Sequence, residues 1–236
     1  MKILVTFAVD SEMGTWRQSS RIARDIRFVR TGIGMRRPQN DLREAFAGSI
    51  DICIASGLAG SLKEEHTVGS VIVARGIKAE GKKTVIPCDG GLIDAAVRCG
   101  AKPVDFFYTS STIANSNGDR ERLGRVADAV DMESFHVLDE ARGSGVPAIA
   151  IRAISDSPDQ TLPIDFSRTV TPQGDIARTM MIRELILHPS RLPAFVRFGI
   201  GSSAAIRNLT DFLDRYVRLL SVNGIGSHVA AEQISR

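Results

Sequence analysis

Short apolar runs that end in polar or glycine-rich residues constrain the fold of this chain most. Three of them cover residues 2–9 (KILVTFAV), 50–55 (IDICIA) and 146–151 (VPAIAI), and polar or glycine-rich residues follow each one. Runs of this length and continuity are typical of strands that are buried on both faces of a sheet. Residues 26–31, 69–77 and 104–108 predict three further strands.

Segments with helical spacing alternate with these runs. Helices are predicted for residues 41–48, 120–129, 132–141, 177–187 and 202–220, and a turn for the GLAG motif at 57–60. This alternation predicts an α/β fold with a central twisted mixed sheet flanked by helices, with ligands at the carboxyl ends of the strands. A length of 236 residues suits one domain. We expect a catalytic core at 1–159 and a helical C-terminal extension at 160–236.

Composition excludes several classes of protein. Apolar residues make up 43% and charged residues 24%, which is ordinary globular usage and argues against disorder. No apolar run is long enough to span a membrane, and the N-terminus is interpreted as a strand rather than a signal peptide. A net charge of +3 is too small to indicate a nucleic-acid partner. Three cysteines without a CxxC pair suggest reduced thiols and a cytoplasmic protein.

Several common motifs are missing. The four histidines are scattered without metal-ligand spacing, so no metal is expected, and no cofactor either. Gly32 and Gly34 follow a predicted strand, but Arg37 takes the third glycine position of GxGxxG. Neither GxxxxGK nor GxSxG is present, which argues against P-loop and nucleophile-elbow enzymes.

Three acidic residues lie where predicted strands or helices begin or end. Glu12 follows the first strand, Glu133 begins the 132–141 helix, and Asp156 follows the last strand. Each alone has an ordinary explanation, since Glu133 suits a helix N-terminus and Asp156 suits a turn. Three acids at one edge of a sheet could instead converge on one ligand.

The motifs around these acids carry a resemblance to a known family. VDMES at 130–134 is followed by RAISD at 152–156, and TGIG at 31–34 and GLAG at 57–60 accompany them. This pattern resembles the nucleoside phosphorylase and nucleosidase superfamily, and most of all the methylthioadenosine/S-adenosylhomocysteine nucleosidases. The resemblance runs from the N-terminus to about residue 159.

The resemblance implies a role for each acid. Asp156 matches the residue that protonates, or hydrogen-bonds to, N7 of the purine. Glu133 matches the carboxylate that holds the ribose hydroxyls, and Met132 would pack on the sugar, although its spacing also fits a helix core. Glu12 matches the residue that activates the attacking water. Cleavage of a C–N glycosidic bond requires an acid at the leaving base and benefits from an anion near the cationic sugar.

Further residues are implied as substrate-binding positions. Arg152 and Ser155 match supporting positions near Glu12 and Asp156, and Gly57 and Leu58 would line the site. The phosphorylases of the family hold phosphate with a Ser or Thr where this chain has Leu58, so water is the expected nucleophile. Ile113 stands where the family has aromatic residues that stack on the purine.

Two arginines next to the TGIG motif keep phosphate as an alternative to water as the nucleophile. Arg36 and Arg37 could recruit phosphate, and the alternative is ordinary surface charge.

The C-terminal third resembles the hopanoid-associated phosphorylase branch of the family. That resemblance implies release of adenine from adenosylhopane, a triterpenoid that carries an adenosine headgroup. The apolar segment 192–198 (LPAFVRF) with neighbouring arginines would suit a membrane surface, and the alternative is that it packs on the sheet. The family also implies a homodimer or larger assembly as partner.

The expected function is cleavage of the N-glycosidic bond of a purine nucleoside, with adenosylhopane as the preferred substrate. Two alternatives within the fold are a phosphorolytic purine nucleoside phosphorylase and a methylthioadenosine/S-adenosylhomocysteine nucleosidase. A third alternative from another class is a catalytically silent nucleoside-binding module.

Overall fold

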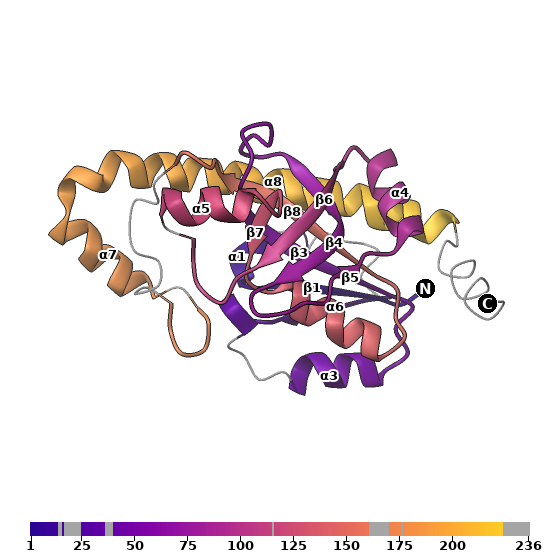
Figure 1. Cartoon of the computed structure of the whole chain (residues 1–236). Helices are drawn as coiled ribbons and strands as arrows, with labels where there is room; N and C mark the ends of the chain where they lie inside the picture. Colours follow the sequence, from indigo (N-terminus) through magenta and orange to yellow (C-terminus); the bar gives the residue numbers. More distant parts are fainter. Residues whose placement is uncertain are drawn as a thin grey trace.

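A computed structural model describes residues 1–13, 16, 25–35, 40–114, 116–160, 170–175 and 177–223. Its centre is an eight-stranded mixed sheet, which confirms the predicted fold class (Figure 1). The strands are β1 (Ile3–Phe7), β2 (Ile26–Arg30), β3 (Ile52–Ser61), β4 (Val71–Ala79), β5 (Ile86–Pro87), β6 (Lys102–Thr109), β7 (Ala129–Asp131) and β8 (Ala148–Asp156).

The pairing closes part of this sheet on itself. The strand order is β2-β1-β3-β7-β6-β4-β5, and β8 pairs with both β3 and β4. Strands β3, β8, β4, β6 and β7 therefore form a ring, with β1 and β2 continuing from β3 as parallel neighbours. Closure leaves no free edges within the ring and gathers the ends of β3, β7 and β8 at one place.

Helices cover this sheet from several sides (Figure 1). Helix α8 crosses one side and packs on β8, β3 and β4, whereas α3 and α6 lie together on the opposite side. The described helices are α1 (Asp10–Met13), α3 (Asn40–Ala47), α4 (Gly90–Arg98), α5 (Asn117–Gly124), α6 (Ser134–Gly143), α7 (Arg178–Leu187) and α8 (Leu192–Asn223), with short 3-10 turns η2 (Ile33–Met35) and η4 (Pro189–Arg191).

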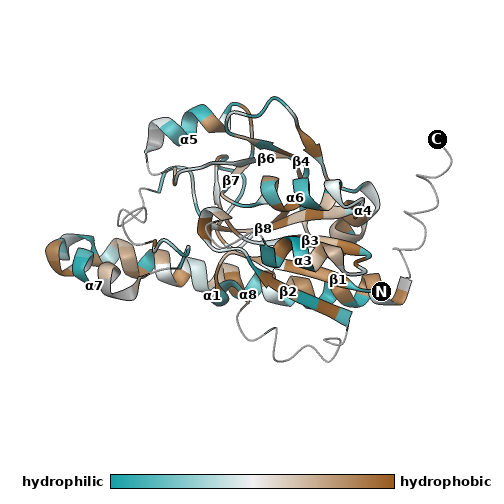
Figure 2. Ribbon diagram, turned by 90° about the horizontal axis from the view of Figure 1, so that it is seen from below, coloured by the Kyte–Doolittle hydropathy of each residue, from teal (hydrophilic) through white to brown (hydrophobic). Residues whose placement is uncertain are grey.

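The two halves of α8 have different surroundings. Its second half belongs to the main hydrophobic core, where Leu209, Leu213 and Val217 are buried on one face. Tyr216 donates a hydrogen bond from its hydroxyl to the carbonyl of Leu92, at 2.9 Å, and so joins α8 to α4. The first half extends with α7 beyond the side of the sheet where α1 and α5 lie, as Figures 1 and 2 both show.

Exposed apolar side chains mark this projecting part, which we call the α7–α8 arm (residues 178–201). They are Met180, Ile186, Leu187, Leu192, Val196 and Ile200. None of the helices in the described part of the chain combines the length and the hydropathy that a bilayer crossing requires.

Some boundaries differ from the sequence-based expectation. The GLAG motif is not a turn, because β3 continues through it to Ser61 and pairs with β8 from Cys53 to Gly60. The helix expected at 132–141 begins only at Ser134, so Met132 and Glu133 precede it. The expected apolar segment 192–198 forms the first turns of α8, which is 32 residues long. Arg36 and Arg37 lie outside the described residues.

Candidate active site

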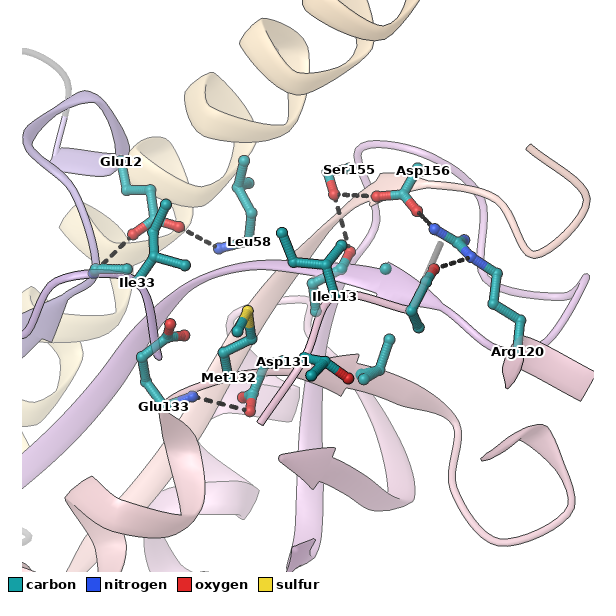
Figure 3. Close-up of a pocket in the computed structure, with 16 residues that line it drawn as sticks. Glu12, Ile33, Leu58, Ile113, Arg120, Asp131, Met132, Glu133, Ser155 and Asp156 are labelled. Atoms are coloured by element: carbon teal, nitrogen blue, oxygen red, sulfur yellow. Dashed lines mark hydrogen bonds and ion pairs between the residues drawn. The ribbon is translucent and has the colours of Figure 1, made fainter. Parts of the chain in front are cut away.

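A cavity of about 170 Å³ opens at the carboxyl ends of β3, β7 and β8 (Figure 3). Its lining includes seven residues singled out from the sequence, which are Glu12, Leu58, Ile113, Met132, Glu133, Ser155 and Asp156. The three acids come from α1, from the segment between β7 and α6, and from the end of β8, and all three are buried. The fold thus brings Glu12 together with two carboxylates that lie more than a hundred residues later in the sequence.

Backbone amides hold Glu12 in place. Its Oε2 accepts hydrogen bonds from the N–H groups of Ala8 and Val9, at 2.9 and 3.3 Å. Its Oε1 accepts one from the N–H of Leu58, at 2.9 Å. Burial nevertheless raises the pKa of Glu12, because desolvation outweighs these bonds and the charge of Arg152. A raised pKa near a substrate suits a group that exchanges protons with water.

Glu133 lies beside Met132 at the same end of the cavity (Figure 3). Its Oε1 accepts a hydrogen bond from the N–H of Gly34, at 2.8 Å. Gly34 has φ of 65°, and a Cβ there would lie 3.3 Å from Cε of Met132, so this close approach favours glycine. Burial, and next the charge of Asp131, raise the pKa of Glu133 to about 8.

A buried ion pair between Arg152 and Asp131 lies beside this end of the cavity. Arg152 Nε donates to Asp131 Oδ2 at 2.9 Å, and Arg152 also donates to the hydroxyl of Ser134 and the carbonyl of Ala55. Asp131 Oδ1 accepts from Thr109 Oγ1 at 2.7 Å. Through these bonds Arg152, on β8, connects β3 and β7 to β8. Arg152 is not among the residues that line the cavity.

Asp156 occupies the opposite end of the cavity (Figure 3). Its Oδ1 accepts from the hydroxyl of Ser155 and its Oδ2 from Nη2 of Arg120, both at 2.5 Å. The same guanidinium donates to the carbonyls of Ala114 and Ser157, at 3.0 and 2.8 Å. Each of the three guanidinium nitrogens of Arg120 donates one of these bonds and the side chain is buried, so Asp156 has a fixed position and a cation held beside it.

Two glycines of β3 keep the site open. A Cβ at Gly60 would lie 3.0 Å from Asp156 Oδ2, and Gly60 is in register with Asp156 on β8 and with Val130 on β7. A Cβ at Gly57 would lie 3.0 Å from Oε1 of Glu12. Gly57 therefore acts beside the cavity, where only glycine leaves room for the Glu12 carboxylate, rather than as a lining residue.

Sequence reasoning missed three residues that shape this site. Arg120 had no signal, because it lies on a short polar helix and meets Asp156 only through the fold. Asp131 stands inside the VDMES motif but was given no role. Gly34 belongs to the TGIG motif, which was part of the family resemblance but did not indicate that the N–H of Gly34 holds Glu133.

The comparisons with known proteins agree with this fold. Residues 103–186 match the model of the phosphorylase superfamily, a range that includes α5, β7, α6 and β8. The predicted resemblance to this superfamily is thereby confirmed. None of the curated protein sequences matches the chain.

Solved structures of nucleosidases share the fold. The 5′-methylthioadenosine/S-adenosyl homocysteine nucleosidase of Helicobacter pylori has 17% identity and a TM-score of 0.66, over 92% of this chain and 98% of that one. The methylthioadenosine/S-adenosylhomocysteine nucleosidase of Colwellia psychrerythraea, in complex with adenine, has 15% identity and a TM-score of 0.66, over 93% and 96%. Futalosine hydrolase of Helicobacter pylori has 16% identity and a TM-score of 0.64, over 92% and 97%.

Proposed function

We propose that this protein is an enzyme that cleaves the N-glycosidic bond of a purine nucleoside and releases adenine from a 5′-substituted adenosine. One observation carries the proposal. Glu12, Glu133 and Asp156 line one cavity, and they are grouped so that two acids face one end and one acid faces the other. A nucleoside has a diol-bearing sugar and a base with proton-accepting nitrogens, and the two groups of acids match these two parts.

In this proposal the sugar occupies the end with Glu12 and Glu133. Glu133 accepts hydrogen bonds from the ribose hydroxyls through the oxygen that Gly34 leaves free. Glu12 orients a water molecule and takes its proton as that water attacks the anomeric carbon. Two carboxylates near a sugar that becomes cationic also stabilise the transition state electrostatically.

The base occupies the other end, next to Asp156. Asp156 transfers a proton to N7 of the purine, which removes the negative charge that the leaving base would otherwise develop. The Arg120 guanidinium faces the charge that remains on Asp156 after this transfer. Ile113 and Ala114 provide an apolar contact for the purine ring, in place of an aromatic residue.

We further propose that the 5′ substituent is large and apolar, as in adenosylhopane. The α7–α8 arm carries six exposed apolar side chains, which an enzyme for a small soluble nucleoside does not need. The arm is connected to the cavity, because the N–H of Ile33, a lining residue, donates to the carbonyl of Gly174 just before α7, at 3.0 Å.

The same arm supports proposals about partners. Exposed apolar residues on a projecting helix pair favour a homodimer or larger assembly, in which a second copy covers part of the arm. Arg183, Arg191 and Arg197 are also exposed on it and favour a peripheral contact with an anionic membrane. A cytoplasmic location is proposed because all three cysteines are free thiols.

The test is release of adenine from a series of 5′-substituted adenosines. Purified protein is incubated with adenosine, methylthioadenosine, S-adenosylhomocysteine and adenosines with 5′-alkyl chains of increasing length, and free adenine is quantified by chromatography. We expect adenine release with kcat/KM rising with chain length. A maximum at methylthioadenosine would favour the ordinary nucleosidase activity instead. Binding of these compounds without any adenine release would indicate a silent binding module and overturn the proposal.

A further inference from the structure

A second group of polar side chains lies away from the cavity, between the β3–β4 loop (residues 62–70) and the residue that precedes β7. It consists of Glu65, His66 and Asp128. His66 Nε2 lies 3.8 Å from Oε1 of Glu65 and 4.0 Å from Oδ1 of Asp128. One atom from each of the three residues falls within 4.8 Å of the other two. None of the three lines the cavity described above.

The imidazole of His66 is buried without a hydrogen-bond partner. Its side chain is 7% exposed, and neither Nδ1 nor Nε2 makes a hydrogen bond. Leaving a buried polar group unsatisfied costs about 1–3 kcal/mol, so such groups are rare. Nε2 faces two carboxylate oxygens at distances that are too long for hydrogen bonds but suited to an ion between them.

The backbone around the cluster fixes Asp128. Its N–H donates to the carbonyl of Phe106, its Oδ2 accepts from the N–H of Phe106, and its carbonyl accepts from the N–H of Leu62, all at 2.9 Å. Oδ1 is therefore held toward His66. Glu65 is mostly exposed, so it can move closer to a ligand and leaves an open path from solvent.

We propose that Glu65, His66 and Asp128 bind a divalent transition-metal ion, with zinc as the best match. One imidazole nitrogen and two carboxylate oxygens are ordinary zinc ligands, and water would complete the set. Two ligands of one tetrahedral zinc lie about 3.3–3.6 Å apart, given bonds of about 2.0–2.2 Å. Rotation of the exposed Glu65 side chain and a small shift of the His66 ring would bring the three ligand atoms, which lie within 4.8 Å of one another, to this spacing.

Such an ion would clamp the β3–β4 loop onto β7. The loop connects two strands of the closed ring, and β7 leads directly into Asp131 and the Glu133 segment. The ion would therefore stabilise the frame of the substrate cavity without touching substrate. This proposal does not depend on the proposed function.

Titration calorimetry of the purified, metal-stripped protein with ZnCl₂ tests the site. We expect saturable binding of one Zn²⁺ in the micromolar range or tighter, and a rise of the unfolding temperature of a few °C at saturation. Glu65→Gln should weaken this binding at least tenfold, whereas the matched control Glu64→Gln, at an exposed neighbouring acid, should leave it unchanged. Folding should be unaffected by Glu65→Gln, because the Glu65 side chain is exposed.

A second pair of variants examines the imidazole. His66→Asn should abolish the binding, and the control His188→Asn, at an exposed histidine, should not affect it. Co²⁺ should give the intense visible absorption of a tetrahedral site in the unaltered protein and lose it in His66→Asn. Absence of saturable Zn²⁺ binding, equal binding by Glu65→Gln and the unaltered protein, or Ca²⁺ binding as tight as Zn²⁺ binding would each overturn the proposal.

Discussion

The two ends of the cavity handle negative charge in different ways. At one end, Asp156 is paired with the buried cation of Arg120 and with the hydroxyl of Ser155. At the other end, Glu12 and Glu133 are held by backbone N–H groups, and burial raises the pKa of both. Among the described residues, Arg152 places a positive charge beside this second end, and it is already bound to Asp131.

This difference suggests that the two ends of the cavity have different roles in the proposed reaction. A carboxylate that is bound to a buried cation and to a hydroxyl keeps a fixed position, as a group that acts on one base requires. Buried carboxylic acids with raised pKa values are unfavourable as anions, and a positive charge nearby makes their ionised form more favourable. In the proposed reaction, the cationic sugar of the transition state supplies that charge at the second end.

The largest expected effect concerns the base end. Asp156→Asn should lower kcat for adenine release by about 10³-fold, because an amide of the same shape cannot transfer a proton to the purine. Binding of adenine, measured by calorimetry, should change much less, because the amide fills the same space. Turnover close to that of the unaltered enzyme would remove Asp156 from the acid role.

The next prediction concerns the cation at that end. Arg120→Met should destabilise the protein by about 3–5 kcal/mol, because it leaves Asp156 buried without its partner. Adding Asp156→Asn to this variant should restore part of the loss, since no uncompensated charge then remains. Urea unfolding of the two single variants and the double variant measures the coupling. Strictly additive losses would mean that the pair is not coupled in solution.

At the sugar end, the expected effect depends on the substrate. At a pH above the pKa of Glu133, Glu133→Gln should reduce kcat/KM for ribonucleosides by about 10–100-fold, because the carboxylate then makes charge-assisted hydrogen bonds to hydroxyls that are worth about 1.5–3 kcal/mol. The loss should be much smaller for 2′-deoxyribonucleosides, which lack one hydroxyl. Glu12→Gln is the matched control, and it should impair both sugars equally. The same discrimination in both variants would contradict the assignment of Glu133.

A smaller effect is expected on the pH dependence of stability. The pKa of Glu133 is about 8 in the folded protein and ordinarily 4.5, so the folded state holds a proton there that the unfolded state has lost. Stability must therefore fall as the pH rises from about 4.5 to about 8, and level off above that range. Glutamine does not titrate, so the stability of the Glu133→Gln variant should fall less over this pH range.

Urea unfolding at pH 5 and pH 8 measures this difference. Between these two values, Glu133→Gln should lose at least about 1 kcal/mol less stability than the unaltered protein. Glu44→Gln, at an exposed glutamate, is the control and should follow the unaltered protein. Parallel curves for all three proteins would show that Glu133 is ionised in the folded state at neutral pH.

Local patterns predicted where three central strands lie, but neither how far β3 and β8 extend nor the contacts between the strand ends. Continuous apolar runs identified β1, β3 and β8, so the acids that follow β1 and end β8 could be found. The Arg120–Asp156 pair could not be predicted, because the two residues lie 36 positions apart and no periodicity relates them. The GLAG motif was expected to be a turn because of its glycines. Pairing with β8 keeps it extended, and the glycines instead make room for Glu12 and Asp156.

The smallest expected effect is that of phosphate. A phosphorylase must desolvate a phosphate dianion and hold it below the sugar with several donors. Here the N–H of Leu58 is already bound to Glu12, and the side chain of Leu58 offers only hydrocarbon. Among the lining residues that the structure describes, Arg120 is the one cation, and Asp156 occupies it. We therefore propose that water, and not phosphate, is the nucleophile.

The rate of adenine release should be the same with and without phosphate, at constant ionic strength and pH. This expectation holds for both protonation states of Glu12, whose pKa is raised. The ionised side chain repels phosphate, and the protonated side chain still orients a water molecule. Sulfate is the control for general anion effects. Identification of the sugar product is decisive, since hydrolysis yields the free sugar even in phosphate buffer. A sugar 1-phosphate whose yield follows the phosphate concentration would reverse the assignment, and variants of Arg36 and Arg37 would then identify the residues that bind the anion.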